Sequence, residues 1–347
     1  MTRALVLAAA VSAAFAQESE LPVFRTETAL VTVGFHVTQK NRYVQTLRPE
    51  DIEILDNGVP QKIAFFEGGD YAPRRVPVDM ILLFDVSGSV TQEGLLDAVV
   101  FKRDLLDGLP FVSLGVYAFD SRLWRLAQLT RDLGQLKFAF DLVEHPERRR
   151  KAGVRSAPLK PPPGRKGGRS GTNLYEAVIE TANDLAHGPA NHTRMMVVFS
   201  DGFGTTDARP EDALKVVNPL GVTVHPVILG HEKLVERIKE AARAVNAQGG
   251  RNPSARDRLS RLQMQEQEIQ DFASLGERTG GRAFDPMVFN DSTVKRIIQG
   301  LVGYVRTEYV VGYTPQPAGG KRSHKVQVRL KNKSLGKLSG GFRTVVY

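Results

Sequence analysis

Residues 80–89 read Met-Ile-Leu-Leu-Phe-Asp-Val-Ser-Gly-Ser, an apolar run that stops at one carboxylate and two hydroxyls. An apolar run without alternation is typical of a strand buried on both faces, as in a parallel sheet with helices above and below. An amphipathic helical pattern follows at once, with apolar residues at Leu95, Leu96, Val99, Val100, Leu105 and Leu106. The stretch therefore predicts a central strand with polar oxygens at its carboxyl end, the edge at which open α/β sheets bind ligands.

Strands and helices alternate over residues 76–308, which indicates a parallel sheet. We predict strands at Asp79–Phe84, Ser113–Phe119, Leu123–Leu129, Met195–Phe199, Val222–Leu229 and Gly281–Phe284. We predict helices near residues 92–107, 132–144, 173–187, 210–217, 232–246, 256–277 and 291–306. The segment Arg251–Arg261 contains Asn-Pro-Ser and many charges, and we interpret it as a solvated surface segment. The predicted fold class is α/β, with a doubly wound, mostly parallel, Rossmann-like sheet.

Both ends of the chain have β character instead. Within residues 22–70, Leu30–Thr38 alternates, and Ile52–Leu55 and Lys62–Phe66 flank Asn57-Gly58, a strong hairpin signal. Residues 309–347 contain three further candidate strands: Tyr309–Tyr313, Lys325–Leu330 and Arg343–Tyr347. Neither end has enough strands for a stable sheet of its own. We therefore expect the two ends to pair, forming an accessory β-sandwich-like domain into which the α/β domain is inserted.

The first residues have the pattern of a secretory signal peptide. Arg3 precedes the apolar run Ala4–Val11, and Ala14-Phe15-Ala16 matches a small-x-small cleavage site, so we expect residues 1–16 to be removed. No later stretch of about 18 apolar residues exists, so we expect no permanent membrane span after cleavage; an uncleaved anchor is the alternative. The expected location is periplasmic or extracellular. The chain has no cysteine, which excludes disulfides, thiolate catalysis and Cys-bound zinc.

The net charge of +9 over 347 residues comes mainly from one segment. Residues 145–170 hold nine basic side chains and one acid, together with several Pro and Gly residues. We interpret this segment as a disordered, solvated insertion, or alternatively as a steering arm for an anionic envelope component. The residues that would meet such a partner are Arg148, Arg149, Arg150, Lys151, Arg165, Lys166 and Arg169. Nucleic acid is disfavoured because the segment lacks aromatic residues.

Two more polar residues are expected at the edge where the central strand ends. Thr172 directly precedes an amphipathic helical pattern, and Asp201 follows the predicted strand Met195–Phe199. The sheet would then gather five oxygen-bearing side chains: Asp85, Ser87, Ser89, Thr172 and Asp201. Such oxygens suit a hard cation such as Mg²⁺ better than a soft one. The alternative is that each residue only caps a helix or closes a turn.

In order and type, these five residues match the metal-ion-dependent adhesion site of the von Willebrand factor A domain, and the sequence resembles this family. More closely, the chain resembles exported bacterial proteins described as von Willebrand factor A-related. These have a short β lead-in (here Val44–Phe66) and a closing segment (here from Thr279-Gly280-Gly281 through Tyr309–Pro315). The resemblance implies direct Mg²⁺ ligation by the hydroxyls of Ser87 and Ser89. The other three residues would complete the shell, often through water, and a partner's carboxylate would occupy an open position.

The function that we expect is therefore exported, divalent-metal-dependent binding of a protein or other ligand that offers a carboxylate. The expected cofactor is Mg²⁺, with Mn²⁺ or Ca²⁺ as alternatives. Asp120 lies just after a predicted strand, and Asp207 lies in the loop beyond Asp201. Either carboxylate could hydrogen-bond to a metal ligand, but we favour the interpretation that both are solvated turn carboxylates.

Two other functions remain open. One is an envelope assembly or scaffold protein with a mainly structural metal; the other, less favoured, is a metal-dependent hydrolase. The seven histidines are scattered without a metal-binding spacing, and the sequence has neither a Gly-x-Ser-x-Gly elbow nor a phosphate loop. We therefore expect no catalytic residues.

Overall fold

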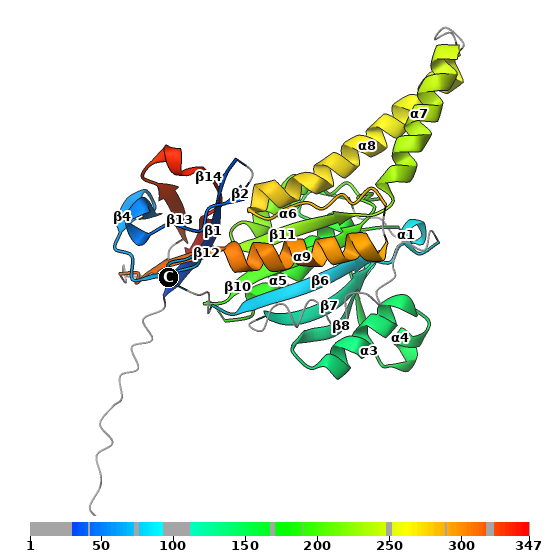
Figure 1. Cartoon of the computed structure of the whole chain (residues 1–347). Coiled ribbons are helices and arrows are strands. Elements are labelled where there is room, and N and C mark those ends of the chain that lie inside the picture. Colours follow the sequence, from blue (N-terminus) through cyan, green and yellow to red (C-terminus); the bar gives the residue numbers. More distant parts are fainter. Residues whose placement is uncertain are drawn as a thin grey trace, which may run out of the picture.

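The structure is a computed structural model that describes residues 30–40, 42–72, 76–92, 112–166, 171–189, 191–247, 252–288, 290–316 and 323–346. The predicted signal peptide lies outside these ranges, as does the predicted helix near 92–107 beyond its first residue. Figure 1 shows an α/β body, a β layer on one side of it, and a helical arm that projects away.

The body is built on a six-stranded sheet of order β11-β10-β6-β7-β8-β9. Its strands are β6 (Val78–Asp85), β7 (Val112–Phe119), β8 (Arg122–Thr130), β9 (Ser156–Pro158), β10 (Thr193–Ser200) and β11 (Val222–Ile228). The first four strands of that order run parallel; β8 is antiparallel to β7, and β9 is antiparallel to β8. The order reverses between β6 and β10, which makes this pair the topological switch point. The predicted doubly wound, mostly parallel α/β fold is confirmed.

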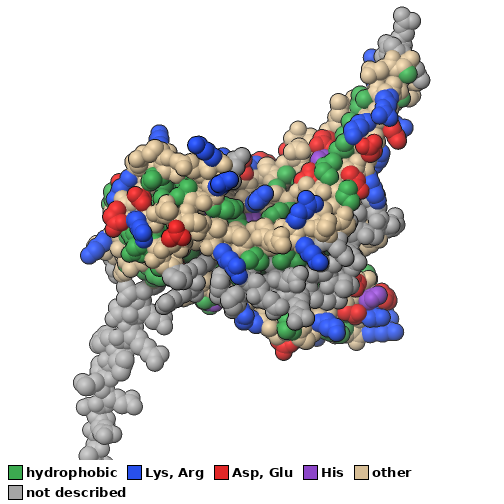
Figure 2. All heavy atoms as spheres, in the orientation of Figure 1, with side chains coloured by type: hydrophobic (Ala, Val, Ile, Leu, Met, Phe, Trp, Pro, Cys, Tyr) green, Lys and Arg blue, Asp and Glu red, His purple; other side chains and the backbone are tan. Residues whose placement is uncertain are grey.

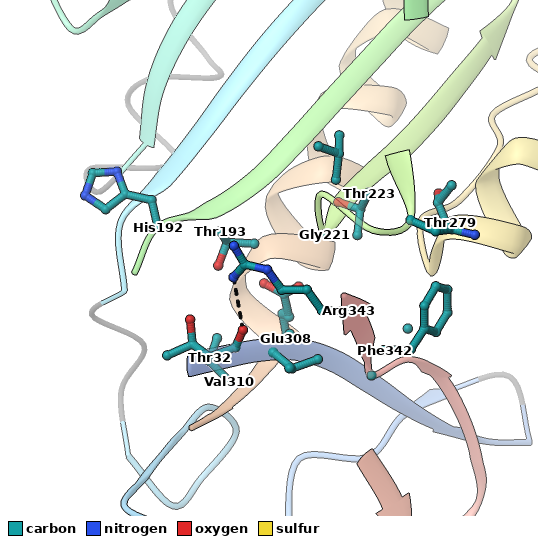
Figure 3. A pocket seen from close by; sticks show the side chains of 16 residues that line it. Thr32, His192, Thr193, Gly221, Thr223, Thr279, Glu308, Val310, Phe342 and Arg343 are labelled. Atoms are coloured by element: carbon teal, nitrogen blue, oxygen red, sulfur yellow. Dashed lines mark hydrogen bonds between the residues drawn. The ribbon is translucent and has the colours of Figure 1, made fainter. Parts of the chain in front are cut away.

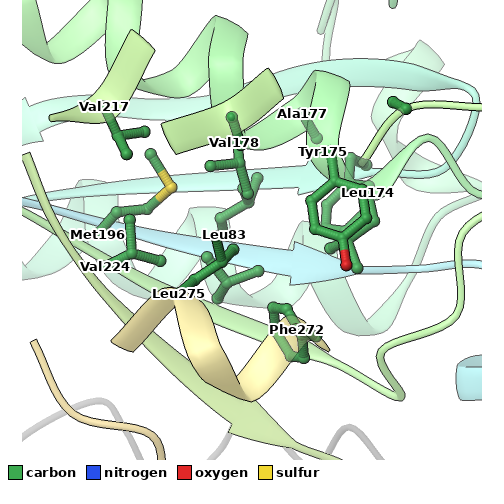
Figure 4. Packing of buried hydrophobic residues seen from close by; sticks show 14 of the residues in the cluster. Leu83, Leu174, Tyr175, Ala177, Val178, Met196, Val217, Val224, Phe272 and Leu275 are labelled. Carbon is green, nitrogen blue, oxygen red and sulfur yellow. The ribbon is translucent and has the colours of Figure 1, made fainter. Parts of the chain in front are cut away.

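Helices cover both faces of this sheet. One face packs against α3 (Leu133–Glu144) and α9 (Asp291–Thr307), and the other against α5 (Leu174–Ala186), α6 (Pro210–Val217) and α8 (Pro253–Thr279). Figure 4 shows the second core, in which Leu83 and Met196 of the sheet meet Val178 of α5 and Leu275 of α8. Full burial of such side chains stabilises the fold by about 1.5–3 kcal/mol each. Strand β6 is apolar throughout its middle because both of its faces are covered.

The arm consists of α7 (His231–Ala247) and α8, which pack against each other and project from the body (Figure 1). The 27 residues of α8 span about 40 Å at 1.5 Å per residue. The segment 251–261, which we expected to be mobile or solvated at the surface, is solvated from Pro253 onward, because most of its side chains there are exposed on the first turns of α8. The side chain of Asn252 accepts hydrogen bonds from the backbone N–H groups of Ser254 and Ala255, and Pro253 suits the first helical position.

Both ends of the chain pair with each other, as predicted. One sheet has the order β14-β1-β12-β5, with β2 beside β1, and the other has the order β15-β13-β3-β4. The strands are β1 (Val31–Gln39), β2 (Arg42–Tyr43), β3 (Ile52–Asp56), β4 (Val59–Gln61), β5 (Phe65–Glu67), β12 (Tyr309–Tyr313), β13 (Ser323–Leu330), β14 (Lys337–Gly340) and β15 (Phe342–Val346). Val33 pairs with Val311, and Ile54 pairs with Val328. Residues from both ends therefore share one apolar core.

Two predicted strands differ from the structure. Asn57 and Gly58 do form a tight turn, with φ of 48° and 83°, but the hairpin's second strand is β4 rather than Lys62–Phe66. Phe65–Glu67 leaves that hairpin and pairs with β12 in the other sheet. Gly281–Phe284 is not a strand, because only Phe284 pairs, through a single bridge to Val227. Apolar pattern alone does not show which partner a short strand will find.

A small cavity of about 40 Å³ lies where the terminal sheets meet the amino ends of β10 and β11. Figure 3 shows Arg343 of β15 in this cavity, where its Nη1 donates to the carbonyl oxygen of Thr32 over 3.2 Å. Gly34 has no room for a Cβ, since the carboxylate of the buried Glu308 occupies that space. The cavity lies at the edge opposite to the carboxyl ends of the parallel strands, so we assign it to the joint between the two parts.

Candidate metal centre

The register of β6 and β10 places the first candidate ligand. Phe84 pairs with Phe199, so Asp85 and Ser200 follow at the same level. The Oγ of Ser200 donates a hydrogen bond of 2.7 Å to Oδ2 of Asp85, whose side chain is fully buried. This bond fixes one carboxylate oxygen at the switch point of the sheet and leaves Oδ1 directed at the following turn.

That turn arranges the two serines. The backbone N–H of Ser87 donates to Oδ1 of Asp85 over 2.9 Å, and the Oγ atoms of Ser87 and Ser89 lie 3.2 Å apart. Helix α1 (Gly88–Gln92) begins here, and the hydroxyl of Thr91 donates to the carbonyl oxygen of Ser87. The carboxylate thus holds the turn in a shape that brings both hydroxyls together.

Thr172 is fixed by backbone contacts to two neighbouring loops. The N–H of Asn173 donates to the carbonyl oxygen of Asp120, just after β7, and the N–H of Thr205 donates to the carbonyl oxygen of Thr172, both over 2.9 Å. Gly171 has a φ of +111°, and a Cβ there would collide with the side chain of Thr205. Thr172 is therefore held between the end of β7 and the loop after β10.

Asp201 begins the loop after β10 and is buried. Its Oδ1 accepts a hydrogen bond of 3.1 Å from the N–H of Phe203, and the N–H of Gly202 donates to the hydroxyl of Ser200 over 3.1 Å. The structure thus joins the turn after β6, the loop of Thr172 and the loop of Asp201 by hydrogen bonds at one edge of the sheet.

The two carboxylates at this edge disfavour each other's charge. Burial, and then the negative charge of Asp201, raise the pKa of Asp85 to about 7, although the hydrogen bonds from Ser200 and Ser87 oppose this shift. Burial also raises the pKa of Glu268 on α8, with a smaller contribution from Asp201. A cation bound between these groups would relieve this repulsion.

The donor set fits a hard divalent cation. It consists of two carboxylates and three hydroxyls, all oxygen donors, without a softer nitrogen or sulfur ligand. Among the described residues, no three His, Asp or Glu side chains gather as a metal site, so hydroxyls would have to supply the remaining ligands. Residues Ser87, Ser89 and Thr172 would hold the cation together with the two carboxylates.

The side chains of Asp120 and Asp207 agree with the interpretation of solvated turn carboxylates. The Oδ1 of Asp120 accepts from the N–H of Arg122 over 2.7 Å and from the hydroxyl of Ser121, so this carboxylate closes its own turn. It is the backbone oxygen of Asp120 that supports the loop of Thr172. Asp207 is exposed. Neither carboxylate makes a hydrogen bond to a candidate ligand among the bonds found in the described residues.

The basic segment is more ordered than we expected. Residues Arg148–Lys151 form helix α4, and Ser156–Pro158 form β9, so the prediction of a disordered insertion is wrong for these parts. Arg149 is 5% exposed; it stacks on Trp124 and donates to two carbonyl oxygens at the end of α3, so it does not face solvent. Stacking and hydrogen bonding of this kind suit the planar guanidinium group.

The other basic residues of the segment divide into paired and exposed ones. Arg148 pairs with Asp141 over 3.0 Å, and Arg165 pairs with Asp212 over 2.8 Å. Burial of Asp212 would raise its pKa, but the hydrogen bond from Arg165 contributes to a net lowering. The side chains of Arg150, Lys151 and Lys166 are exposed, and Arg169 lies outside the described residues.

Sequence reasoning missed Ser200 and a cavity next to the site. Ser200 directly precedes Asp201, but only the register with β6 shows that it holds Asp85. A cavity of about 190 Å³ extends from Ser89 and Asp201 to the base of the arm. No local pattern in the sequence predicts it, because it forms between elements far apart in the chain.

No protein-family model and no curated protein matches this chain. Three solved structures that match are BatB from Bacteroides thetaiotaomicron, the mussel byssus protein PTMP1 with a zinc-occupied MIDAS motif, and the ArnB paralog VWA2 from Sulfolobus acidocaldarius. Their identities are 15%, 13% and 12%, with TM-scores of 0.41, 0.40 and 0.39. The matches cover 66%, 70% and 85% of this chain, and 99%, 48% and 74% of those chains. The structural neighbours are von Willebrand factor A-domain proteins, the family that the sequence resembles, and the likeness is one of fold.

Proposed function

We propose that this chain is an exported binding protein that depends on a divalent cation. The cation is held by Asp85, Ser87, Ser89, Thr172 and Asp201, and it accepts a carboxylate from the partner. One observation carries the proposal: hydrogen bonds link the turn after β6 to Ser200 of β10, next to Asp201, and bring two hydroxyls to 3.2 Å from each other. Turn closure alone would not require three hydroxyls and two buried acids at the same edge.

The charge of the donor set explains why a carboxylate is the expected partner group. Two carboxylates and three neutral hydroxyls leave the field of a divalent cation incompletely compensated where the carboxylates bind through water. Mg²⁺ also keeps several waters in a near-octahedral shell, so it offers a position that a partner's oxygen can take. An incoming Asp or Glu side chain is then favoured by its charge.

The chain is proposed to bind rather than to catalyse, in the periplasm or outside the cell. No helix within the described ranges is long and apolar enough to cross a membrane. We further propose that residues 76–308 form the metal-binding domain, carried by an accessory domain of residues 22–70 and 309–347. The pairing of β1 with β12 and of β3 with β13 supports this division. A scaffold protein with a structural metal remains the second candidate function.

Titration of Mn²⁺, followed by water-proton relaxation, tests the proposal. Wild type should bind one Mn²⁺ that Mg²⁺ displaces, and acetate should then reduce the relaxation by replacing a bound water. Asp85→Ala should abolish binding, and Ser89→Ala, at an exposed position, should weaken it without affecting folding. Asp207→Ala is the matched control, since this exposed acid lies on the same loop as Asp201. Equal Mn²⁺ affinity in all four proteins would contradict the proposal, whereas metal binding without an acetate effect would favour the scaffold function.

A further inference from the structure

The cavity beside the candidate metal centre has one anionic and one cationic side. Ser89 and Asp201 line it at the edge of the sheet, and Lys233 and Arg237 of α7 line it at the base of the arm. Both basic side chains belong to exposed residues four apart, so they lie on the same face of the helix. Figure 2 shows that Lys and Arg side chains alternate with acids along the arm, so the position at the cavity, rather than overall charge, distinguishes these two.

The start of α7 is anchored to the body, which fixes the backbone that carries these two side chains. Leu234, between them in the sequence, is buried in the core of the body. His231, the first residue of α7, lies 2.6 Å from Oδ2 of Asp285 through Nδ1 and 2.9 Å from Oε2 of Glu266 through Nε2. The hydrogen bonds to both acids raise the pKa of His231 against the opposing effect of burial, so its charge favours this anchoring. Glu266, the acid of α8 next to the cavity-lining Gln265, is thereby engaged with His231.

The size of the cavity limits what it can receive. A volume of about 190 Å³ is below the roughly 300–1,000 Å³ of a typical small-molecule pocket, so it suits one or two side chains of a partner. Besides the two basic residues, its lining includes Leu229, Leu234 and Ile269, which are apolar and buried. A short aliphatic chain that ends in an acid matches both features.

We propose that the partner is recognised through two acidic groups. The first carboxylate binds the cation at the metal centre, and the second enters the cavity and pairs with Lys233 and Arg237. This inference rests on the proposed function, since it needs the cation for the first carboxylate. It adds a requirement that the metal centre alone does not impose: a second acid at a fixed distance from the first.

Simple carboxylates test the inference without knowledge of the partner. The Mn²⁺-loaded protein is titrated with acetate, succinate, glutarate and adipate, again followed by water-proton relaxation. At least one dicarboxylate should bind about tenfold or more tightly than acetate, because one charge-assisted hydrogen bond contributes enough for such a factor. Lys233→Ala and Arg237→Ala should each reduce that advantage, and the double variant should reduce it to the level of acetate.

Arg243→Ala is the matched control, because Arg243 is exposed on the same helix, further along the arm, and does not line the cavity. It should leave the preference for dicarboxylates unchanged. The two ideas fail in different ways. If wild type binds no Mn²⁺, both the proposed function and the inference of two acidic groups are wrong. If Mn²⁺ and acetate bind but no dicarboxylate is preferred, or if the preference survives the double variant, only the inference is overturned.

Discussion

The buried imidazole of His225 should contribute a loss of stability in mild acid. His225 lies on β11, is fully buried, and accepts a hydrogen bond of 3.1 Å at Nδ1 from the N–H of Arg282. Its ring packs edge-on against Tyr304 of α9, and the tilted ring of His36 on β1 lies 3.9 Å from that of Tyr304. Burial, and then the proximity of His36, lower the pKa of His225 to about 3. The folded protein therefore keeps this ring neutral at the joint between the body and the terminal sheets.

The sign and size of the effect follow from this pKa. In the unfolded chain the ring has its ordinary pKa of 6.5, so it is protonated below pH 6.5. In the folded protein the ring stays neutral down to a pH of about 3, so acid favours the unfolded state in this range. The contribution of the neutral ring to the free energy of unfolding is fully present above pH 6.5 and decreases as the pH falls towards 3. At about 1.4 kcal/mol per pH unit, acidification from pH 6.5 to 5 costs roughly 2 kcal/mol. This is a large part of a typical stability of about 5–15 kcal/mol.

Urea unfolding followed by circular dichroism at pH 7.5 and 5 measures this contribution. The variant His225→Asn keeps an acceptor for the N–H of Arg282 but has no group that titrates. It should be less stable than wild type at pH 7.5 and should lose about 2 kcal/mol less between the two pH values. His187→Asn, at an exposed position, controls for removal of a histidine and should lose as much as wild type. Equal losses in wild type and His225→Asn would refute the argument.

Three further changes test other parts of the structure. Gly171→Ala places a Cβ against Thr205 at a positive φ, so it should lower both thermal stability, by about 1–3 kcal/mol, and Mn²⁺ affinity; unchanged affinity would show that this loop does not position Thr172. Arg149→Ala should destabilise by about 1–3 kcal/mol in urea unfolding, because two buried carbonyl oxygens lose their donors, while Arg150→Ala should not. Deletion of residues 337–347 removes β14 and β15, so hydrogen exchange in β1 should accelerate, and unchanged protection there would contradict the pairing.

Much of the fold could be predicted from local patterns. The uninterrupted apolar run of β6 indicates a strand that is covered on both faces, and helical periodicity placed α6 within its observed bounds. The count of strands at the two ends predicted that they pair, because neither end could form a sheet by itself. The same patterns placed Asp85 and Asp201 at strand ends, where the parallel order of the sheet brings them to one edge.

Other features depend on which segments contact each other, and local sequence patterns do not predict these contacts. The register of β6 against β10 gives Asp85 its hydrogen-bond partner Ser200. Arg149, which we expected at the surface, is buried because it donates to carbonyl oxygens at the end of α3. Phe284 pairs alone, although we predicted a strand over Gly281–Phe284. The cavity between the sheet edge and Lys233 exists only because the arm begins beside that edge. Periodicity indicates how much of a residue is covered, whereas register and packing determine which side chains cover it. Only the first of these can be inferred from local sequence patterns.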